Sequence, residues 1–226
     1  MKSTNAANYD LIIAGGGVIG ASIAWRLARN QLRVLLLDAG KIGAEASSAA
    51  AGMLSPGGEF DQPALLDFAI GSLAKYDEFV AALQADSGKP VEFRHVGAVQ
   101  IALTNAELES LSARAASQRA AGIPSTVLTS DQLHTLVPML RADAIGAIYY
   151  TNEAIIDPAA LIAALRAACL ALGVTIQEDA PVTSIAASTA GVRVCLAHQA
   201  LDASFAVLAA GPWSSGISVT LDAQPY

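Results

Sequence analysis

The stretch from Tyr9 to Asp38, YDLIIAGGGVIGASIAWRLARNQLRVLLLD, restricts the fold of this chain more than any other part of the sequence. A short apolar run, Leu11 to Ala14, is long enough for one buried strand, and a run of glycines follows it. Apolar residues then recur at helical spacing from Val18 to Leu27, and a second apolar run ends on Asp38. Strand, tight turn, helix and strand in this order form the frame that a dinucleotide-binding fingerprint requires.

The glycines of this stretch fill the three positions of a G-x-G-x-x-G pattern. Gly15 allows a sharp turn off the strand, Gly17 lets a pyrophosphate approach the backbone, and Gly20 allows close packing of helix and strand. The free N–H groups and the partial positive charge at the start of the helix favour phosphate groups. Asp38 ends the second strand, where a carboxylate accepts hydrogen bonds from ribose hydroxyls. Because its charge would repel a 2′-phosphate, Asp38 argues against NADP but does not separate NAD from FAD.

The segment after Asp38 is made almost entirely of small residues. From Ala44 to Gly52 it consists mainly of alanine, serine and glycine. It could be a flexible linker or a helix of small residues. The alternative is a cofactor cradle, because a flat ring system and its pyrophosphate can lie against backbone only where side chains are small. Ser47 and Ser48 would then donate hydrogen bonds to phosphate or ring oxygens.

GGGVIG, LLLDAG and GAEASSAAAGML together resemble the D-amino-acid oxidase superfamily of flavoproteins, and within it they are most similar to the glycine oxidases. The resemblance implies FAD as the cofactor. It implies that Val18 and Ile19 lie over the pyrophosphate, that Asp38 and Ala39 bind the adenosine ribose, and that Val182 contacts the adenosine end through its backbone. The positions that would line the flavin and its phosphates are Ala46, Ser47, Ala51, Gly52 and Met53.

The resemblance also implies a Rossmann-like α/β fold with a mainly parallel sheet and a partial antiparallel α+β insertion. We expect a discontinuous FAD-binding domain in residues 1–85 and 150–226, and part of a substrate domain in residues 86–149. Residues 63–84 have the apolar spacing of one amphipathic helix. Thr104 with Glu107, and Thr129 with Gln132, have the spacing of capping boxes that begin two further helices.

The activity implied by the resemblance is oxidative deamination of a small amino acid or amine, such as glycine, sarcosine or a D-amino acid. Hydride passes to FAD, dioxygen is reduced to hydrogen peroxide, and the family link is to thiamine biosynthesis. Family members continue past this point and there carry the arginine that binds the substrate carboxylate. No catalytic residue can therefore be assigned, and we expect little turnover by this chain alone.

Three alternatives remain open at this stage. The chain could be a catalytically inactive dinucleotide-binding fragment of such an enzyme, or a D-amino-acid dehydrogenase that passes electrons to a quinone. An NAD-linked dehydrogenase is less well supported, because nicotinamide binding does not need the Ala/Ser/Gly segment. The amine and the oligomeric state stay undetermined, with a homo-oligomer as one outcome.

Composition excludes several other classes. The chain has a net charge of −7 and no basic cluster, which argues against nucleic acid as a partner. Its least polar stretch, Leu11 to Trp25, is too short and too rich in glycine to span a membrane. The residues before Arg26 lack the pattern of a signal peptide, so we expect a cytoplasmic protein. Two cysteines without C-x-x-C spacing and three scattered histidines indicate no metal site.

Overall fold

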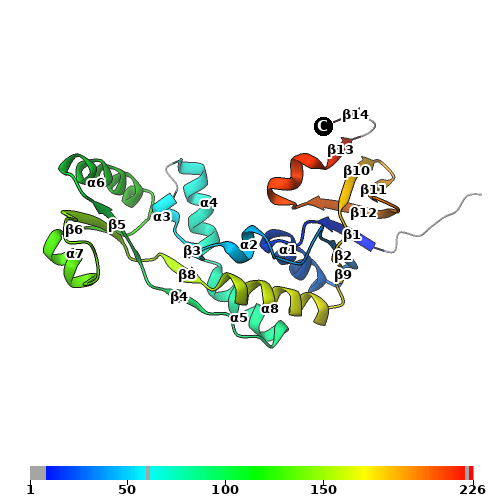
Figure 1. The fold of residues 1–226 in the computed structure, drawn as a ribbon, viewed down its shortest axis with the longest axis horizontal. Coiled ribbons are helices and arrows are strands. Elements are labelled where there is room, and N and C mark those ends of the chain that lie inside the picture. Colours follow the sequence, from blue (N-terminus) through cyan, green and yellow to red (C-terminus); the bar gives the residue numbers. More distant parts are fainter. Residues whose placement is uncertain (1–8, 60–61, 222–223, 226) are drawn as a thin grey trace, which may run out of the picture. The chain divides into compact units, whose positions relative to one another are not determined.

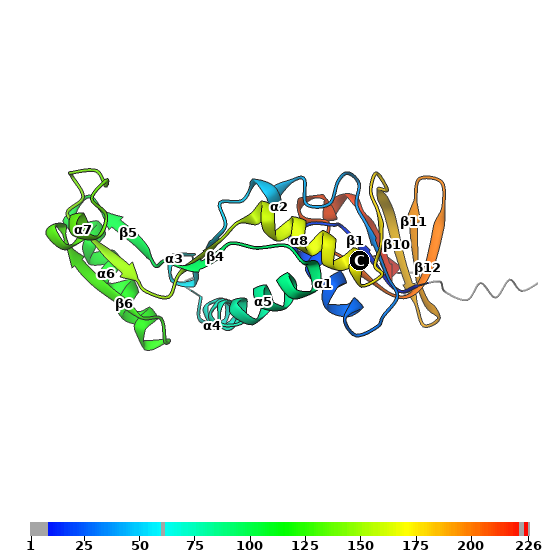
Figure 2. The ribbon, with the colours of Figure 1, turned by 90° about the horizontal axis from the view of Figure 1, so that it is seen from below.

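The computed structural model describes residues 9–59, 62–221 and 224–225 of the chain. Contacts between residues divide it into two compact units. The first unit consists of Met1–Ala51, Ala81–Val91 and Pro158–Tyr226, and the second of Gly52–Val80 and Glu92–Asp157. Figures 1 and 2 show the elements of each unit, coloured along the sequence. The unit boundaries differ from the domain boundaries expected at residues 85 and 150, and the assignment of domains to cofactor and substrate stays a prediction.

The first unit contains an eight-stranded sheet in which the central strands are parallel. The expected α/β class with a mainly parallel sheet is confirmed. In spatial order the strands are β14 (Gln224–Pro225), β13 (Ser218–Leu221), β10 (Val182–Ser188), β11 (Gly191–Leu196), β12 (Ala200–Leu208), β1 (Tyr9–Ala14), β2 (Val34–Leu37) and β9 (Thr175–Gln177).

Strand β1 is covered on both faces, which explains its continuous apolar sequence. On one face, α1 (Val18–Ala28) packs so closely that a Cβ on Gly20 would lie 3.3 Å from the Cγ2 of Ile13. Helix α8 (Pro158–Ala171) lies beside α1 (Figure 1), and the thiol of Cys169 donates to the carbonyl of Ala21.

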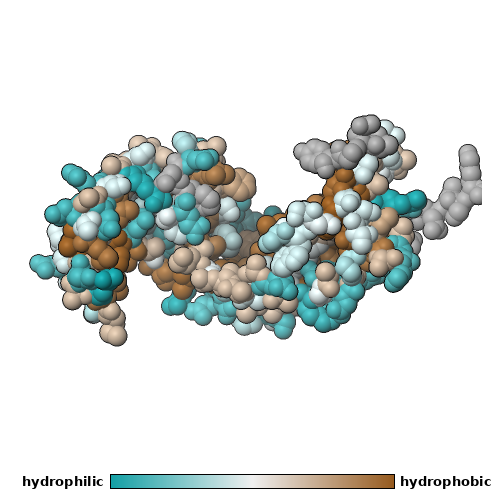
Figure 3. Space-filling model, turned by 45° about the horizontal axis from the view of Figure 1, so that its top comes forward, coloured by the Kyte–Doolittle hydropathy of each residue, from teal (hydrophilic) through white to brown (hydrophobic). Residues whose placement is uncertain are grey.

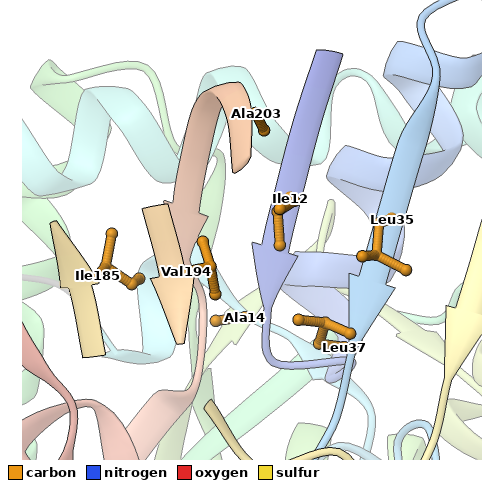
Figure 4. Packing of buried hydrophobic residues seen from close by; sticks show 7 residues of the cluster. All are labelled: Ile12, Ala14, Leu35, Leu37, Ile185, Val194 and Ala203. Carbon is orange, nitrogen blue, oxygen red and sulfur yellow. The ribbon is translucent and has the colours of Figure 1, made fainter. Parts of the chain in front are cut away.

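A buried apolar cluster covers the other face of this sheet. Strands β1 and β2 contribute side chains that alternate with those facing α1, and strands β10, β11 and β12 contribute the rest. Figure 4 shows these side chains gathered over the sheet. They are Ile12, Ala14, Leu35, Leu37, Ile185, Val194 and Ala203. This packing fixes the ends of β1 and β2, from which the loops of the candidate site emerge.

The second unit contains two three-stranded antiparallel sheets. Strand β8 (Ala154–Ile156) lies between β3 (Met53–Leu54) and β4 (Phe93–His95), and β7 (Gly146–Tyr150) lies between β5 (Ala98–Ala102) and β6 (Ser125–Thr129). Strands β7 and β8 follow each other in the sequence, yet each pairs with other strands. The helices are α3 (Pro56–Glu59), α4 (Pro63–Leu73), α6 (Asn105–Ala120) and α7 (Ser130–Leu136), and α5 (Tyr76–Ser87) continues into the first unit.

Both capping boxes are confirmed. The Thr104 hydroxyl accepts from the N–H of Glu107, and the Thr129 hydroxyl accepts from the N–H of Gln132, each with the reciprocal side-chain bond. The single helix expected over residues 63–84 is wrong, because the structure has two helices, α4 and α5. The break follows Gly71 and Ser72, a pair at which helices commonly kink, and the Lys75 N–H bonds the Ser72 carbonyl three residues back.

Candidate functional site

The turn after β1 can be made only by glycine. Gly15 has a φ of 109°, and a Cβ at this position would collide with the carbonyl oxygen of Ala209. The N–H of Gly15 donates to Leu37 at the end of β2, and the N–H of Ala209 donates to Ala14 at the end of β1. The turn therefore lies between the carboxyl ends of neighbouring parallel strands, the edge of a doubly wound sheet at which ligands bind.

Helix α1 begins directly behind this turn. Gly17 is its N-cap residue and provides no side-chain hydrogen bond, and the N–H of Ala21 donates to its carbonyl. A Cβ on Gly20 would collide with the carbonyl oxygen of Gly15, so glycine is required for this close approach. Val18 is half-buried and the side chain of Ile19 is 66% exposed. The first N–H groups of a helix have no partners within it, which leaves this end suited to an anion.

Asp38 connects the glycine turn with the loop after β2. Its Oδ2 accepts from the N–H of Gly16 over 2.6 Å, and its Oδ1 accepts from the N–H of Gly40 over 2.8 Å. The carboxylate thus faces the turn, as ribose binding requires. Each carboxylate oxygen has a second lone pair that can accept from a hydroxyl group. The next residue, Ala39, is exposed and adds no bulk beside the carboxylate.

The Ala/Ser/Gly segment folds back onto the glycine turn. Its short helix α2 (Ala46–Ala49) brings the Ser47 hydroxyl to the start of α1, where Oγ accepts from the N–H of Val18 over 2.9 Å. A Cβ on Gly17 would lie 3.1 Å from the same oxygen. Ala46 and Ala51 are exposed, so the segment presents small side chains and backbone around Ser47.

Val182 lies on the same side of the first unit as Asp38. It is the first residue of β10, and two residues earlier the N–H of Ala180 donates to the carbonyl of Asp38 over 2.8 Å. Among the expected site residues, Gly17 and Val18 lie at the Ser47 hydroxyl, and Asp38 binds the N–H of Gly16, the residue after Gly15.

Gly52 and Met53 belong to the second unit. Gly52 has a φ of 78°, and its carbonyl accepts from the N–H of Ile156 over 2.9 Å. Met53 begins β3, pairs with Ile155 of β8, and has a side chain that is 61% exposed. The backbone at these two positions is fixed by strand pairing, whereas the methionine side chain is open to solvent.

Comparison with known proteins now decides the family. The family model described as FAD dependent oxidoreductase matches residues 10–225. The chain belongs to this family. It is 32% identical over 221 residues to glycine oxidase of Bacillus licheniformis, covering 96% of this chain and 58% of that protein. The crystal structure of glycine oxidase from Geobacillus kaustophilus superposes with a TM-score of 0.88 at 30% identity, covering 93% of this chain and 57% of that one. An opine oxidase component of Rhizobium meliloti is 32% identical over 187 residues, covering 80% of this chain and 50% of that protein.

The expected resemblance to flavoproteins of this family is thus confirmed, and the chain spans somewhat more than half the length of the glycine oxidases that it matches. FAD is the cofactor of the family, so the NAD-linked alternative loses its support. The residues present fit such a cofactor. The start of α1 and the Ser47 hydroxyl offer hydrogen-bond donors to a pyrophosphate, and a side chain at Gly17 would crowd that place.

Several anchoring residues of this family member were missed by sequence reasoning. Glu178 accepts from the N–H of Ile42 over 3.2 Å, which lowers the pKa of its carboxyl group. Lys41 pairs with Asp179 over 2.7 Å and with Glu178 over 3.4 Å. These bonds tie the loop after β2 to the loop after β9. Acidic residues in a surface loop follow no helical or strand periodicity, so the sequence carries no signal for these hydrogen bonds and ion pairs.

The residues to which the sequence assigned no role have local partners. Arg94 pairs with Glu92 over 3.0 Å, and Arg141 pairs with Asp143. The hydroxyl of Tyr150 donates to Gln118. Within the described residues no cluster of His, Cys, Asp or Glu could bind a metal ion. No helix in the described part of the chain has the length and apolar character needed to cross a membrane.

A hollow of about 330 Å³ lies at the amino ends of the central strands. Its lining includes Tyr9, Arg33, Val34 and Thr175. Since β1 and β2 run away from this edge toward the glycine turn, the hollow lies at the wrong end of the sheet for a dinucleotide. We therefore base the candidate site on the turn, Asp38 and Ser47.

Proposed function

We propose that this chain forms the FAD-binding portion of an amino-acid or amine oxidoreductase. The observation that carries the proposal is the convergence of Ser47 on the N–H of Val18 and of Asp38 on the N–H of Gly16. Both side chains reach the mouth of the glycine turn from the segment that follows the second strand. This convergence would place donors for the pyrophosphate and an acceptor for the ribose along one line.

The proposed roles follow from the chemistry of each group. Val18 and Ile19 would lie over the pyrophosphate, and the N–H group of Ile19 would donate to one of its oxygens. The Ser47 hydroxyl accepts from Val18 and keeps its own hydrogen to donate to a phosphate. Asp38 and Ala39 would bind the ribose, and Val182 would contact the adenosine end through its backbone. Ala46, Ala51, Gly52 and Met53 would leave room for the flavin.

Hydride transfer from the α-carbon of the substrate is the chemistry that a flavin supplies when bound. We propose a small amino acid or amine as the substrate, with water and dioxygen consumed and a keto acid, ammonia and hydrogen peroxide released. The similarity to glycine oxidases supports this reaction. We propose the link to thiamine biosynthesis on the resemblance of the sequence motifs alone. The similarity to the opine oxidase component supports a broader range of amines.

An absorption spectrum of the purified protein tests cofactor binding. Bands of oxidised flavin that stay with the protein through gel filtration are the expected result, and their absence would contradict the proposal. Peroxide release on adding glycine, sarcosine or a D-amino acid would then establish the oxidase reaction. Flavin reduction without peroxide, followed by reoxidation on adding a quinone, would identify a dehydrogenase instead.

The cytoplasmic location, the absence of nucleic-acid partners and the oligomeric state stay predictions. Figure 3 shows hydrophobic residues in brown on the surface among hydrophilic ones in teal. Exposed large apolar residues include Phe68 and Met139 in the second unit and Phe205 and Trp213 in the first. Apolar residues of this kind would lie at the contact of a homo-oligomer, and sedimentation velocity distinguishes a homo-oligomer from a monomer.

A further inference from the structure

The second unit contains two buried polar side chains and one half-buried arginine that all bond to one glycine. We name Glu153, Gln118 and Arg114 the Gly57 cluster. Glu153 precedes β8, whereas Gln118 and Arg114 come from one face of α6. Gln118 and Glu153 are each only 3% exposed. Buried polar groups lower the stability of the folded protein unless they are hydrogen-bonded. The hydrogen bonds that these side chains make to Gly57 therefore need an explanation.

Both backbone groups of Gly57 are bound by this cluster. The N–H of Gly57 donates to Oε1 of Glu153 over 2.8 Å. Its carbonyl accepts from Nε2 of Gln118 over 2.9 Å and from Nη2 of Arg114 over 3.2 Å. The same Arg114 nitrogen donates to the carbonyl of Gly58 over 3.1 Å. Hydrogen bonds are directional, so these bonds define the place and the orientation of three successive peptide groups.

The cluster is itself held rigidly. The carbonyl of Glu153 accepts from the N–H groups of Val96 and Gly97 over 3.1 and 2.9 Å. The Tyr150 hydroxyl donates to Oε1 of Gln118 over 2.9 Å, and the Tyr150 ring is 1% exposed. A Cβ on Gly57 would lie 2.6 Å from that ring, so the segment lies in close contact with it.

The segment that the cluster holds directly follows the Ala/Ser/Gly loop of the candidate site. Its first residue, Gly52, is bound to β8 through the N–H of Ile156, and its later part is bound at Gly57. Between these two points lie Met53, Leu54, Ser55 and Pro56. An apolar core around Leu66 and Tyr150 already packs this unit, and such packing is not directional. The polar bonds therefore add a constraint on backbone position.

We propose that Glu153, with Gln118 and Arg114, is a positioning residue that fixes the Gly52–Glu59 segment so that Gly52 and Met53 present their backbone correctly to the flavin. This inference rests on the proposed function. None of the three side chains is assigned a contact with the cofactor. They act through the peptide groups of Gly57 and Gly58, and Glu153 contributes the only bond to the N–H of Gly57 among the described residues.

The test compares three variants of the purified protein. Glu153→Ala removes the acceptor for the N–H of Gly57, and Glu153→Gln keeps an acceptor oxygen of similar shape. Leu133→Ala is the matched control, because Leu133 is fully buried in the same unit but belongs to a different apolar cluster. Amide hydrogen exchange of residues 52–59, the dissociation constant for FAD and the visible circular dichroism of bound flavin are measured at a temperature at which every variant is folded.

Glu153→Ala should speed exchange at Gly57, weaken FAD binding about tenfold and alter the flavin dichroism, because the buried N–H of Gly57 loses its acceptor. Glu153→Gln should restore all three, and Leu133→Ala should lower the unfolding temperature without changing FAD affinity more than about threefold. If Glu153→Ala does not fold, Gln118→Leu replaces it in the test. We expect Gln118→Leu also to speed exchange at Gly57, weaken FAD binding and alter the flavin dichroism.

Two outcomes would overturn the inference in different ways. Wild-type protein that binds no FAD would contradict the proposed function and, with it, the role of the cluster. Wild-type protein that binds FAD, together with a Glu153→Ala variant of unchanged affinity and flavin dichroism, would leave the proposed function standing and refute the positioning role alone. Equal losses in Glu153→Ala and Leu133→Ala would also refute it, because general destabilisation would then explain both.

Discussion

The hydroxyl oxygen of Ser47 lies 2.9 Å from the backbone nitrogen of Val18 and accepts its hydrogen bond. The two residues are 29 positions apart, and their contact brings the small-residue segment to the start of α1. A phosphate oxygen bound at this place would accept from the hydroxyl hydrogen of Ser47, because the N–H group of Val18 already donates to that hydroxyl oxygen. This pair therefore provides the sharpest test of the candidate site.

Ser47→Ala should weaken FAD binding about tenfold, because a hydrogen bond to a charged phosphate contributes more than one between neutral groups. Flavin fluorescence titration measures the dissociation constant. Ser48→Ala is the matched control, since the Ser48 hydroxyl donates to the Gly43 carbonyl within the loop. It should change FAD affinity less than about threefold. Equal effects of the two substitutions would count against a phosphate contact by Ser47.

Asp38→Asn should lower FAD affinity by about tenfold or more. The amide has one acceptor oxygen, so either Gly16 or Gly40 loses its partner, and the negative charge beside the ribose disappears. Asp10→Asn is the control. The carboxylate of Asp10 binds the backbone and guanidinium of Arg33 at the opposite edge of the sheet, and Arg33 holds its pKa at about 2. Unchanged affinity in Asp38→Asn would exclude a role for this carboxylate in binding.

Gly15→Ala should reduce the free energy of unfolding by about 2 kcal/mol or more, because it combines a left-handed φ with a collision against Ala209. Gly173→Ala separates the two effects. Gly173 has a φ of 80°, and nothing lies within 4 Å of an added Cβ. Gly173→Ala should lower the free energy of unfolding by about 1 kcal/mol, which is the effect of the conformational strain alone. Urea unfolding followed by circular dichroism gives both values, and similar losses would mean that the backbone at Gly15 can move aside.

The pH dependence of stability should reveal the buried Glu153. Burial raises the pKa of its carboxyl group in the folded state, the nearby Glu59 adds to this rise, and the Ser55 hydroxyl and the N–H groups of Gly57 and Gly58 oppose it. The folded protein therefore binds this proton more tightly than the unfolded chain does. The stabilisation of the folded protein by this bound proton is complete below the ordinary pKa of 4.5, and it is lost as the pH rises through the raised pKa of the folded state.

Glu153→Gln cannot ionise and should lack this component. Relative to wild type, it should be more stable at pH 8 than at pH 5, as measured by urea midpoints at both values. Parallel midpoints for the two proteins across this range would show that Glu153 ionises in the folded protein as it does in the unfolded chain.

Local sequence was enough to predict the glycine turn, the crossover to Asp38 and the two capping boxes. Each depends on conformations or hydrogen bonds among residues close in the chain. The continuous helix over residues 63–84 was wrong because apolar periodicity does not register a kink at Gly71 and Ser72.

By itself, the sequence determined the glycine-turn crossover unit, the acid at the end of its second strand and the family, because turn chemistry and periodicity act within a few residues. Only the tertiary structure decided which distant groups meet there. Glu178 reaches the N–H of Ile42 across 136 positions, and Glu153 reaches the N–H of Gly57 across 96. The physical reason is that such bonds depend on strand register and on how the loops are brought together. The residues next to a glutamate in a loop are the same whether its carboxyl group is solvated or buried, so local sequence cannot distinguish the two cases.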